Sequence, residues 1–172
     1  NDFEQHGLIN EIWEDLPCIE NCYPPDVDGA DLVAVNEGET FRADFELDPG
    51  RRISGTLAFE GAPTNESFVN VWDSAGVRIA GAGNQGDGNW ETPPLPVGTY
   101  YLTARGEDWG LVSEVYDDHA CPWEACDVTL GDPVALADSD VHGIAFDLAP
   151  EERLWCLRGS ILDGASNPVG GA

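Results

Sequence analysis

The sequence contains no lysine and no methionine, and only seven arginines stand against 33 aspartates and glutamates. The resulting formal net charge of −26 repels nucleic acid and anionic lipid, so neither is an expected partner. No apolar run reaches the ~18 residues of a membrane-spanning helix, so we expect no membrane insertion. Because the sequence begins at Asn1, we expect a chain that was processed or belongs to a longer one.

The composition is nevertheless that of a folded protein. At 42% hydrophobic and 9% aromatic residues, the chain differs from a disordered acidic tail and can bury a core. Its 172 residues allow one domain, or one and a half.

Two stretches of the sequence about 100 residues apart repeat each other block by block. A cysteine pair follows the first block in both copies. The matching blocks are residues 7–15 with 110–118, residues 31–35 with 132–136, residues 45–49 with 146–150, and residues 52–57 with 157–161. Matches that keep the same order along the chain indicate a tandem repeat.

The repeat predicts three parts. We expect residues 51–149 to form a complete unit, residues 1–50 to be the C-terminal half of a preceding unit, and residues 150–172 to be the N-terminal strand or strands of a following one. Such a chain is either a stretch of a long array or the building block of a head-to-tail fibre. In the fibre the end pieces would complete one another between chains, because an open heterologous contact propagates.

Alternating apolar residues predict β-strands through most of the chain. The alternation is clean at residues 41–47, 100–104 and 144–148, and glycine and proline clusters such as residues 93–98 separate these runs. About eight short strands in each unit, without apolar residues at helical spacing, predict an antiparallel β-sandwich.

Several segments of the complete unit carry distinctive motifs, namely residues 53–57 (ISGTL), 69–76 (VNVWDSAG), 88–90 (GNW) and 95–102 (LPVGTYYL), and residues 159–172 begin a second copy similarly. Together these segments resemble the carboxypeptidase regulatory-like domain, a prealbumin-like β-sandwich of bacterial surface and secreted proteins. The expected fold class is therefore all-β, an antiparallel prealbumin- or immunoglobulin-like β-sandwich in tandem repeats. The resemblance implies an accessory or repeat module of cell-surface arrays and not a peptidase. The segment after residue 106 departs from the family pattern.

Two cysteine pairs, Cys18 with Cys22 and Cys121 with Cys126, are expected to form local disulfides. A turn can bring such close residues within the ~4.4–6.8 Å between Cα atoms that the bond requires. The alternative is a zinc site that includes His119, but the other copy has no histidine at the corresponding place. Disulfides indicate an oxidising setting, so we expect an extracellular or cell-surface protein.

Cys156 has no close cysteine partner in the sequence. One interpretation is a buried free thiol, or a bridge to a residue outside this sequence. The other is an intermolecular disulfide that links chains in a fibre.

Clusters of carboxylates suggest calcium as a cofactor, and no other cofactor is expected. Oxygen ligands at alternate positions suit calcium, although the spacing of an EF-hand loop is absent. In so acidic a chain, a solvated surface is the competing interpretation. The candidate ligands are Asp26, Asp28 and Asp31 in one loop and Glu114, Asp117 and Asp118 in another.

Trp72 and Trp109 are candidates for stacking on sugar rings, although tryptophans also serve as core or interface residues. The three histidines lie in no metalloprotease motif, and no G-x-S-x-G elbow occurs. We therefore expect no catalytic residue and no enzyme.

Together these features predict a structural or adhesive extracellular protein, assembled head-to-tail into a filament or stalk through strand complementation between repeats. Its expected partners are copies of itself or adjacent repeats, with glycans as a second class. The alternative function is a carbohydrate- or calcium-binding accessory module of a secreted hydrolase or adhesin.

Overall fold

A computed structural model describes residues 6–13, 15–20, 22, 29–122 and 126–151. Within them the chain forms short β-strands and 3₁₀ turns. The strands are β1 (Glu11–Ile12), β2 (Leu16–Pro17), β3 (Ile53–Phe59), β4 (Ala62–Pro63), β5 (Phe68–Trp72), β6 (Arg78–Gly86), β7 (Asn89–Glu91), β8 (Gly98–Arg105), β9 (Glu114–Val115), β10 (His119–Ala120), β11 (Val134–Leu136) and β12 (Val141–Leu148). The 3₁₀ turns are η1 (Glu107–Trp109) and η3 (Val128–Leu130). None of the described helices is long and apolar enough to cross a membrane.

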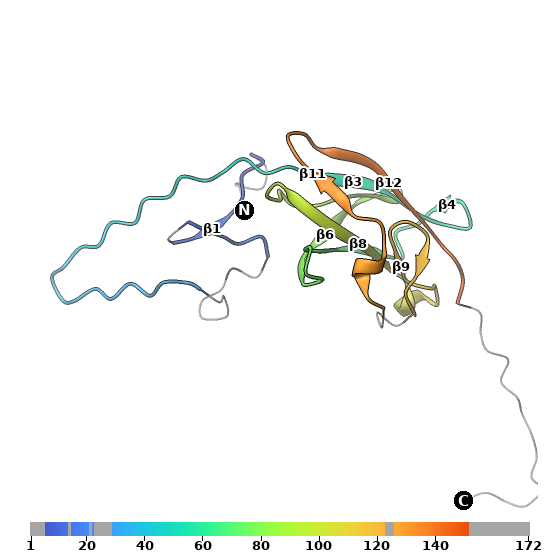
Figure 1. The fold of residues 1–172 in the computed structure, drawn as a ribbon, viewed down its shortest axis with the longest axis horizontal. Coiled ribbons are helices and arrows are strands. Elements are labelled where there is room, and N and C mark those ends of the chain that lie inside the picture. The colour runs from blue at the N-terminus through green and yellow to red at the C-terminus, as the bar shows by residue number, and fades with distance from the viewer. Residues whose placement is uncertain (1–5, 14, 21, 23–28, 123–125, 152–172) are drawn as a thin grey trace, which may run out of the picture.

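Most strands belong to one sheet that curls into a half-barrel (Figure 1). Its strand order is β10-β9-β8-β5-β6-β7-β3-β12, with β11 added to β8 and β4 added to β3. Neighbouring strands are antiparallel except β3 and β12, which run parallel. The prediction of an all-β, mainly antiparallel fold is confirmed. Where the sequence predicts a sandwich, the described chain has one large curled sheet and the separate two-stranded sheet of β1 and β2. A period of two identifies a buried face but not the strand that pairs beside it.

Alternating side chains of β3, β8 and β12 fill the core. Leu57, Leu102 and Phe146 are almost completely buried, as the alternation at residues 100–104 and 144–148 predicts. The ring of Phe146 lies 6.2 Å from the ring of Trp90 and 6.0 Å from that of Tyr116. These aromatic contacts join β12 to β7 and to the end of β9.

The close approach of β12 to β3 depends on a glycine. A Cβ atom added at Gly55 would collide with the carbonyl oxygen of Ile144, its neighbour in β12. Any side chain at this position would therefore push β12 off the sheet. In the sequence, residues 157–161 match residues 53–57, and Gly159 stands at the position that corresponds to Gly55.

Residues 31–47, which we call the arm, contain no strand although their sequence alternates (Figure 1, the long loop beside the sheet). The prediction of a strand at residues 41–47 is therefore wrong for this chain. The backbone of a strand needs a neighbour to satisfy its N–H and C=O groups, and no strand is hydrogen-bonded along the arm. Alternation in the sequence indicates which side chains are suited to burial, but it does not show whether a neighbouring strand is present to pair with the segment.

Candidate functional site: the N-terminal segment

The hairpin near the start of the chain has the same geometry as a hairpin in the main sheet. β1 and β2 pair in the same register as β9 and β10, with each paired residue 103 positions before its counterpart. The turn aspartates Asp15 and Asp118 both adopt a left-handed φ, of 56° and 57°. Gly7 and Gly110, which precede the hairpins, have φ values of 69° and 73°. The two hairpins thus have the same register and the same turn conformation.

The contacts around the two hairpins also match. Each copy carries a disulfide after its hairpin, with Cα atoms 5.6 Å apart in the first and 5.2 Å in the second. In each copy an isolated β-bridge also joins the residue after the glycine that precedes the hairpin to a proline about 40 residues later. The bridges pair Leu8 with Pro49 and Leu111 with Pro150. The matched backbone hydrogen bonds are Cys18 N to Asn10 O and Cys121 N to Ser113 O (2.7 Å each), Ile9 N to Asp48 O and Val112 N to Ala149 O (2.9 Å each), and Gly50 N to Gly7 O and Glu151 N to Gly110 O (2.8 Å each).

The two copies differ at the arm. In the second copy, the segments that match the arm are β11, which pairs with β8, and β12, which pairs with β3. β11 and β12 thus lie against different strands and do not pair with each other. The arm has the same two limbs but no counterpart of β8 or β3 beside it.

Apolar side chains that are buried in β11 and β12 are exposed in the arm. Val134 and Leu136 are 6% and 2% exposed, whereas their counterparts Val33 and Val35 are 42% and 53% exposed. Phe146 is 1% exposed and its counterpart Phe45 is 53% exposed. Exposed apolar residues at alternate positions make the arm a candidate interaction surface.

One aromatic contact of the arm differs from that of the complete unit. Trp13 corresponds to Tyr116, whose ring contacts Phe146. Trp13 instead lies 5.1 Å from the ring of Phe41, four residues before Phe45, the counterpart of Phe146. Phe45 itself is 53% exposed.

The N-terminal segment, by which we mean residues 7–50, contacts the main sheet closely. Ile9 is buried, and a Cβ atom at Gly50 would lie 2.5 Å from the Cβ of Pro94 and 3.0 Å from the amide nitrogen of Leu95. Arg51 and Leu95 exchange two backbone hydrogen bonds of 2.9 and 2.8 Å. Only a residue without a side chain fits at this junction.

A second contact involves the first disulfide loop. The carboxylate of Glu20 accepts a hydrogen bond from Arg78 Nη1 at 2.6 Å and from the backbone amide of Gly81 at 3.2 Å. Arg78 Nε also donates to Asn70 Oδ1 at 2.7 Å, and Asn70 is buried in β5. Ile19 of the same loop packs against the core. The segment thus contacts the sheet at two separate places.

Replacing Arg78 should destabilise the protein more than replacing its ionic partner. Arg78→Ala leaves the buried Asn70 oxygen without its donor, and we expect a loss of about 1–3 kcal/mol in the free energy of unfolding. Glu20→Ala removes one half of an ion pair whose side chains are 37–39% exposed, so we expect about 1 kcal/mol or less. Urea unfolding of both variants measures the difference. Equal losses would show that the ion pair, and not the Asn70 contact, carries the stability.

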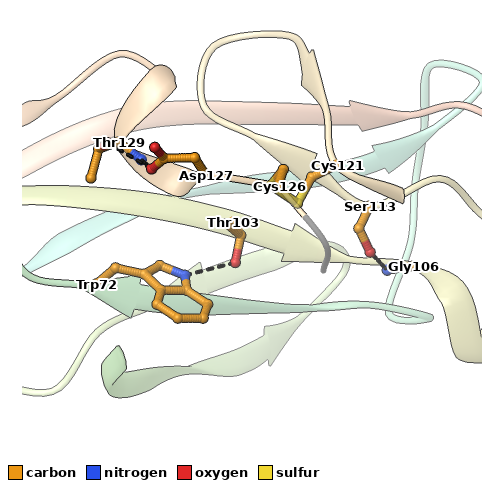
Figure 2. The surroundings of a disulfide bond; sticks show 8 residues. All are labelled: Trp72, Thr103, Gly106, Ser113, Cys121, Cys126, Asp127 and Thr129. Atoms are coloured by element: carbon orange, nitrogen blue, oxygen red, sulfur yellow. Dashed lines mark hydrogen bonds between the residues drawn. A yellow bond between two sulfur atoms is a disulfide. The ribbon is translucent and has the colours of Figure 1, made fainter. Parts of the chain in front are cut away.

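Around the second disulfide lies a cavity of about 200 Å³ (Figure 2). Trp72, Thr103, Ser113 and the disulfide line it, and the Trp72 indole N–H donates to Thr103 Oγ1 at 2.9 Å. At the edge of the cavity, Asp127 accepts hydrogen bonds from the hydroxyl and the amide of Thr129, which lower the pKa of its carboxyl.

A buried carboxyl lies on the adjacent hairpin. Glu114 in β9 is 8% exposed, and its Oε1 has no hydrogen-bond partner. Burial, followed by the charges of Asp118 and Asp117 and more weakly Asp147, raises its pKa to about 7, although a hydrogen bond from the Asp118 backbone lowers it. The fold therefore favours the protonated form of this carboxyl.

The structure places the cysteines as expected, with disulfides between Cys18 and Cys22 and between Cys121 and Cys126. The thiols that a zinc site with His119 would need are thus joined to each other. Cys156 lies outside the described residues.

The candidate calcium ligands are only partly described. Asp26 and Asp28 lie outside the described residues, and Asp31 is exposed at the start of the arm. Asp117 and Asp118 form the turn after Glu114. In the described part of the chain, no group of three or more histidine, cysteine, aspartate or glutamate side chains is arranged to hold a metal ion.

The two candidate stacking tryptophans have different surroundings. Trp72 lines the cavity and has its indole N–H bound to Thr103. Trp109 is 41% exposed and its ring lies 6.4 Å from that of Phe68. Glycan stacking stays a prediction for both.

Sequence reasoning missed the contact between Glu20 and Arg78 and the burial of Glu114. Glu20 and Arg78 are 58 residues apart and no pattern links them, although arginine is scarce enough in this chain to mark each one for inspection. For Glu114 a signal exists, because the glutamate recurs in both copies beside an apolar residue of the hairpin.

A comparison of the chain with protein-family models and with curated proteins finds no match. The resemblance to the carboxypeptidase regulatory-like domain therefore stays a prediction from its motifs.

Proposed function

We propose that this chain is a stretch of an extracellular structural protein, built as a stalk or filament from tandem copies of one β-domain. The observation that carries the proposal is the repeated local structure, in which the described part of residues 7–50 reproduces the hairpin, the disulfide and three backbone hydrogen bonds of residues 110–151. In this interpretation the complete unit is residues 51–149, and the N-terminal segment is the closing half of the unit before it.

Three further features support a role as a rigid extracellular spacer. The segment contacts the sheet both at Gly50 and through Glu20, so successive units would keep a fixed orientation. The disulfides suit an oxidising, extracellular setting. The high negative charge would keep long arrays from aggregating.

Electron microscopy of the native protein tests the proposal. We expect extended particles with a regular axial repeat. Reduction of the disulfides should make them flexible, because the loop that carries Glu20 is closed by Cys18 and Cys22. A parallel sample in EDTA tests whether the acidic loops contribute. Compact, separate particles in every condition would contradict the structural role.

A further inference from the structure

We propose that the arm completes the sheet of a preceding copy of this domain in the same polypeptide, where it occupies the places that β11 and β12 hold in the complete unit. The inference rests on the proposed function and names the partner of the arm. That partner is a half-domain of the kind formed by residues 51–105, which contains β3 to β8.

The pairing of the complete unit gives the register of the contact. β11 runs antiparallel to β8 and pairs Val134 with Tyr100, so Val33 would lie opposite the counterpart of Tyr100. β12 runs parallel to β3 and pairs Phe146 with Leu57. Phe45 would accordingly lie opposite the counterpart of Leu57. Both limbs of the arm would then bury the apolar residues that are now exposed.

The side chains of the arm fit this register. At positions whose counterparts are buried the arm has Val33, Val35, Ala43, Phe45 and Leu47, all apolar. Polar residues stand at positions whose counterparts are exposed. Asp44 corresponds to the exposed Ala145, and Glu46 corresponds to the exposed Asp147. Because a slip by one residue would reverse which side chains face inward, the match favours one register.

The domain in this chain cannot be the partner, because its own β11 and β12 already occupy β8 and β3. A second complete copy of the chain has the same strands occupied. The partner must therefore be a half-domain that lacks its closing strands, and the preceding repeat is such a half-domain.

The connection along the chain also fits a partner in the same polypeptide. In the complete unit, β8 ends at Arg105 and Gly110 starts the closing half. Since Gly7 corresponds to Gly110, a preceding β8 would end at the position of Asp2. The arm would then fold back onto strands covalently attached to it, with no cost of bringing two molecules together.

An extended chain tests the inference. A copy of residues 51–103 is fused directly before Asn1, and in a second version a copy of residues 51–109 is fused before Gly7, so that the natural connection is kept. Hydrogen–deuterium exchange is then measured at residues 33–35 and 43–47. We expect these amides to exchange about 100-fold more slowly than in the original chain, as those of β11 and β12 do in the same molecule.

Two matched substitutions in the arm separate pairing from general compaction. Phe45→Asp places a charge where Phe146 is buried in the complete unit, and it should abolish the protection. Phe41→Asp changes an aromatic residue of the same limb whose counterpart, His142, is exposed, and it should leave the protection intact.

The inference is overturned if the arm exchanges equally fast in the original chain and in both extended versions. It is also overturned if the added half stays unprotected throughout, because the arm should then have completed it. Protection lost equally with Phe41→Asp and Phe45→Asp would contradict the register. These outcomes are independent of the electron microscopy, since repeats could form a stalk without exchanging strands, and a completed sheet could occur in a compact protein.

Discussion

Phe146→Ala should lower the free energy of unfolding by about 3–5 kcal/mol, whereas Phe45→Ala should change it by no more than about 0.5 kcal/mol. The two phenylalanines hold matching places in the repeat, but Phe146 is 1% exposed and Phe45 is 53% exposed. Removing the Phe146 ring leaves a cavity beside Trp90 and Tyr116 in the core. Removing the Phe45 ring takes an apolar group away from water.

Urea unfolding of both variants, followed by tryptophan fluorescence, measures this difference. The pair is its own control, because the chemical change and the surrounding sequence pattern are the same. A loss of several kcal/mol for Phe45→Ala would show that the arm is already packed in this chain, and it would remove the basis for an absent partner. In the extended chain of the preceding section, Phe45→Ala should become as costly as Phe146→Ala.

The strands with a neighbour in the chain could largely be predicted from the sequence. The alternation at residues 100–104 and 144–148 gives both the strands β8 and β12 and their buried faces. The same pattern at residues 41–47 gives no strand. Side-chain alternation indicates the environment for which a segment is suited. A strand also needs the backbone of a neighbouring strand for its hydrogen bonds, and residues 41–47 have no such neighbour in the part of the chain that the structure describes.

The parallel pairing of β3 and β12 could not be predicted in this way. The two strands are separated by more than 80 residues in the sequence. The one sequence feature that reflects their contact is Gly55, where a side chain would collide with β12. The disulfides, by contrast, follow from short spacing alone, since a loop of five or six residues holds both cysteines within reach. The repeat itself was the most informative pattern for the candidate site, because it supplies a partnered copy with which to compare the unpartnered one.

The stability of the protein should fall as the pH rises from about 5 to 8, through Glu114. Its folded-state pKa of about 7 lies above the ordinary value of 4.5, so the fold favours the protonated acid. The associated stability is fully present below pH 4.5 and is lost as the pH rises through 7. A shift of this size corresponds to about 3 kcal/mol between the two limits.

Glu114→Gln should remove this dependence, because the amide keeps the shape of the protonated acid but cannot ionise. We expect the variant to be more stable than the original chain by about 3 kcal/mol at pH 8 and by about 1 kcal/mol at pH 5. The whole chain also carries excess negative charge, which adds a background slope of the same sign. Glu66→Gln, at an exposed position, therefore serves as the control, and it should keep the original slope in urea unfolding measured from pH 5 to 8. If Glu114→Gln keeps that slope as well, the dependence comes from the general charge and the burial of Glu114 does not set it. If the slope disappears only in Glu114→Gln, the buried carboxyl of Glu114 sets the pH dependence.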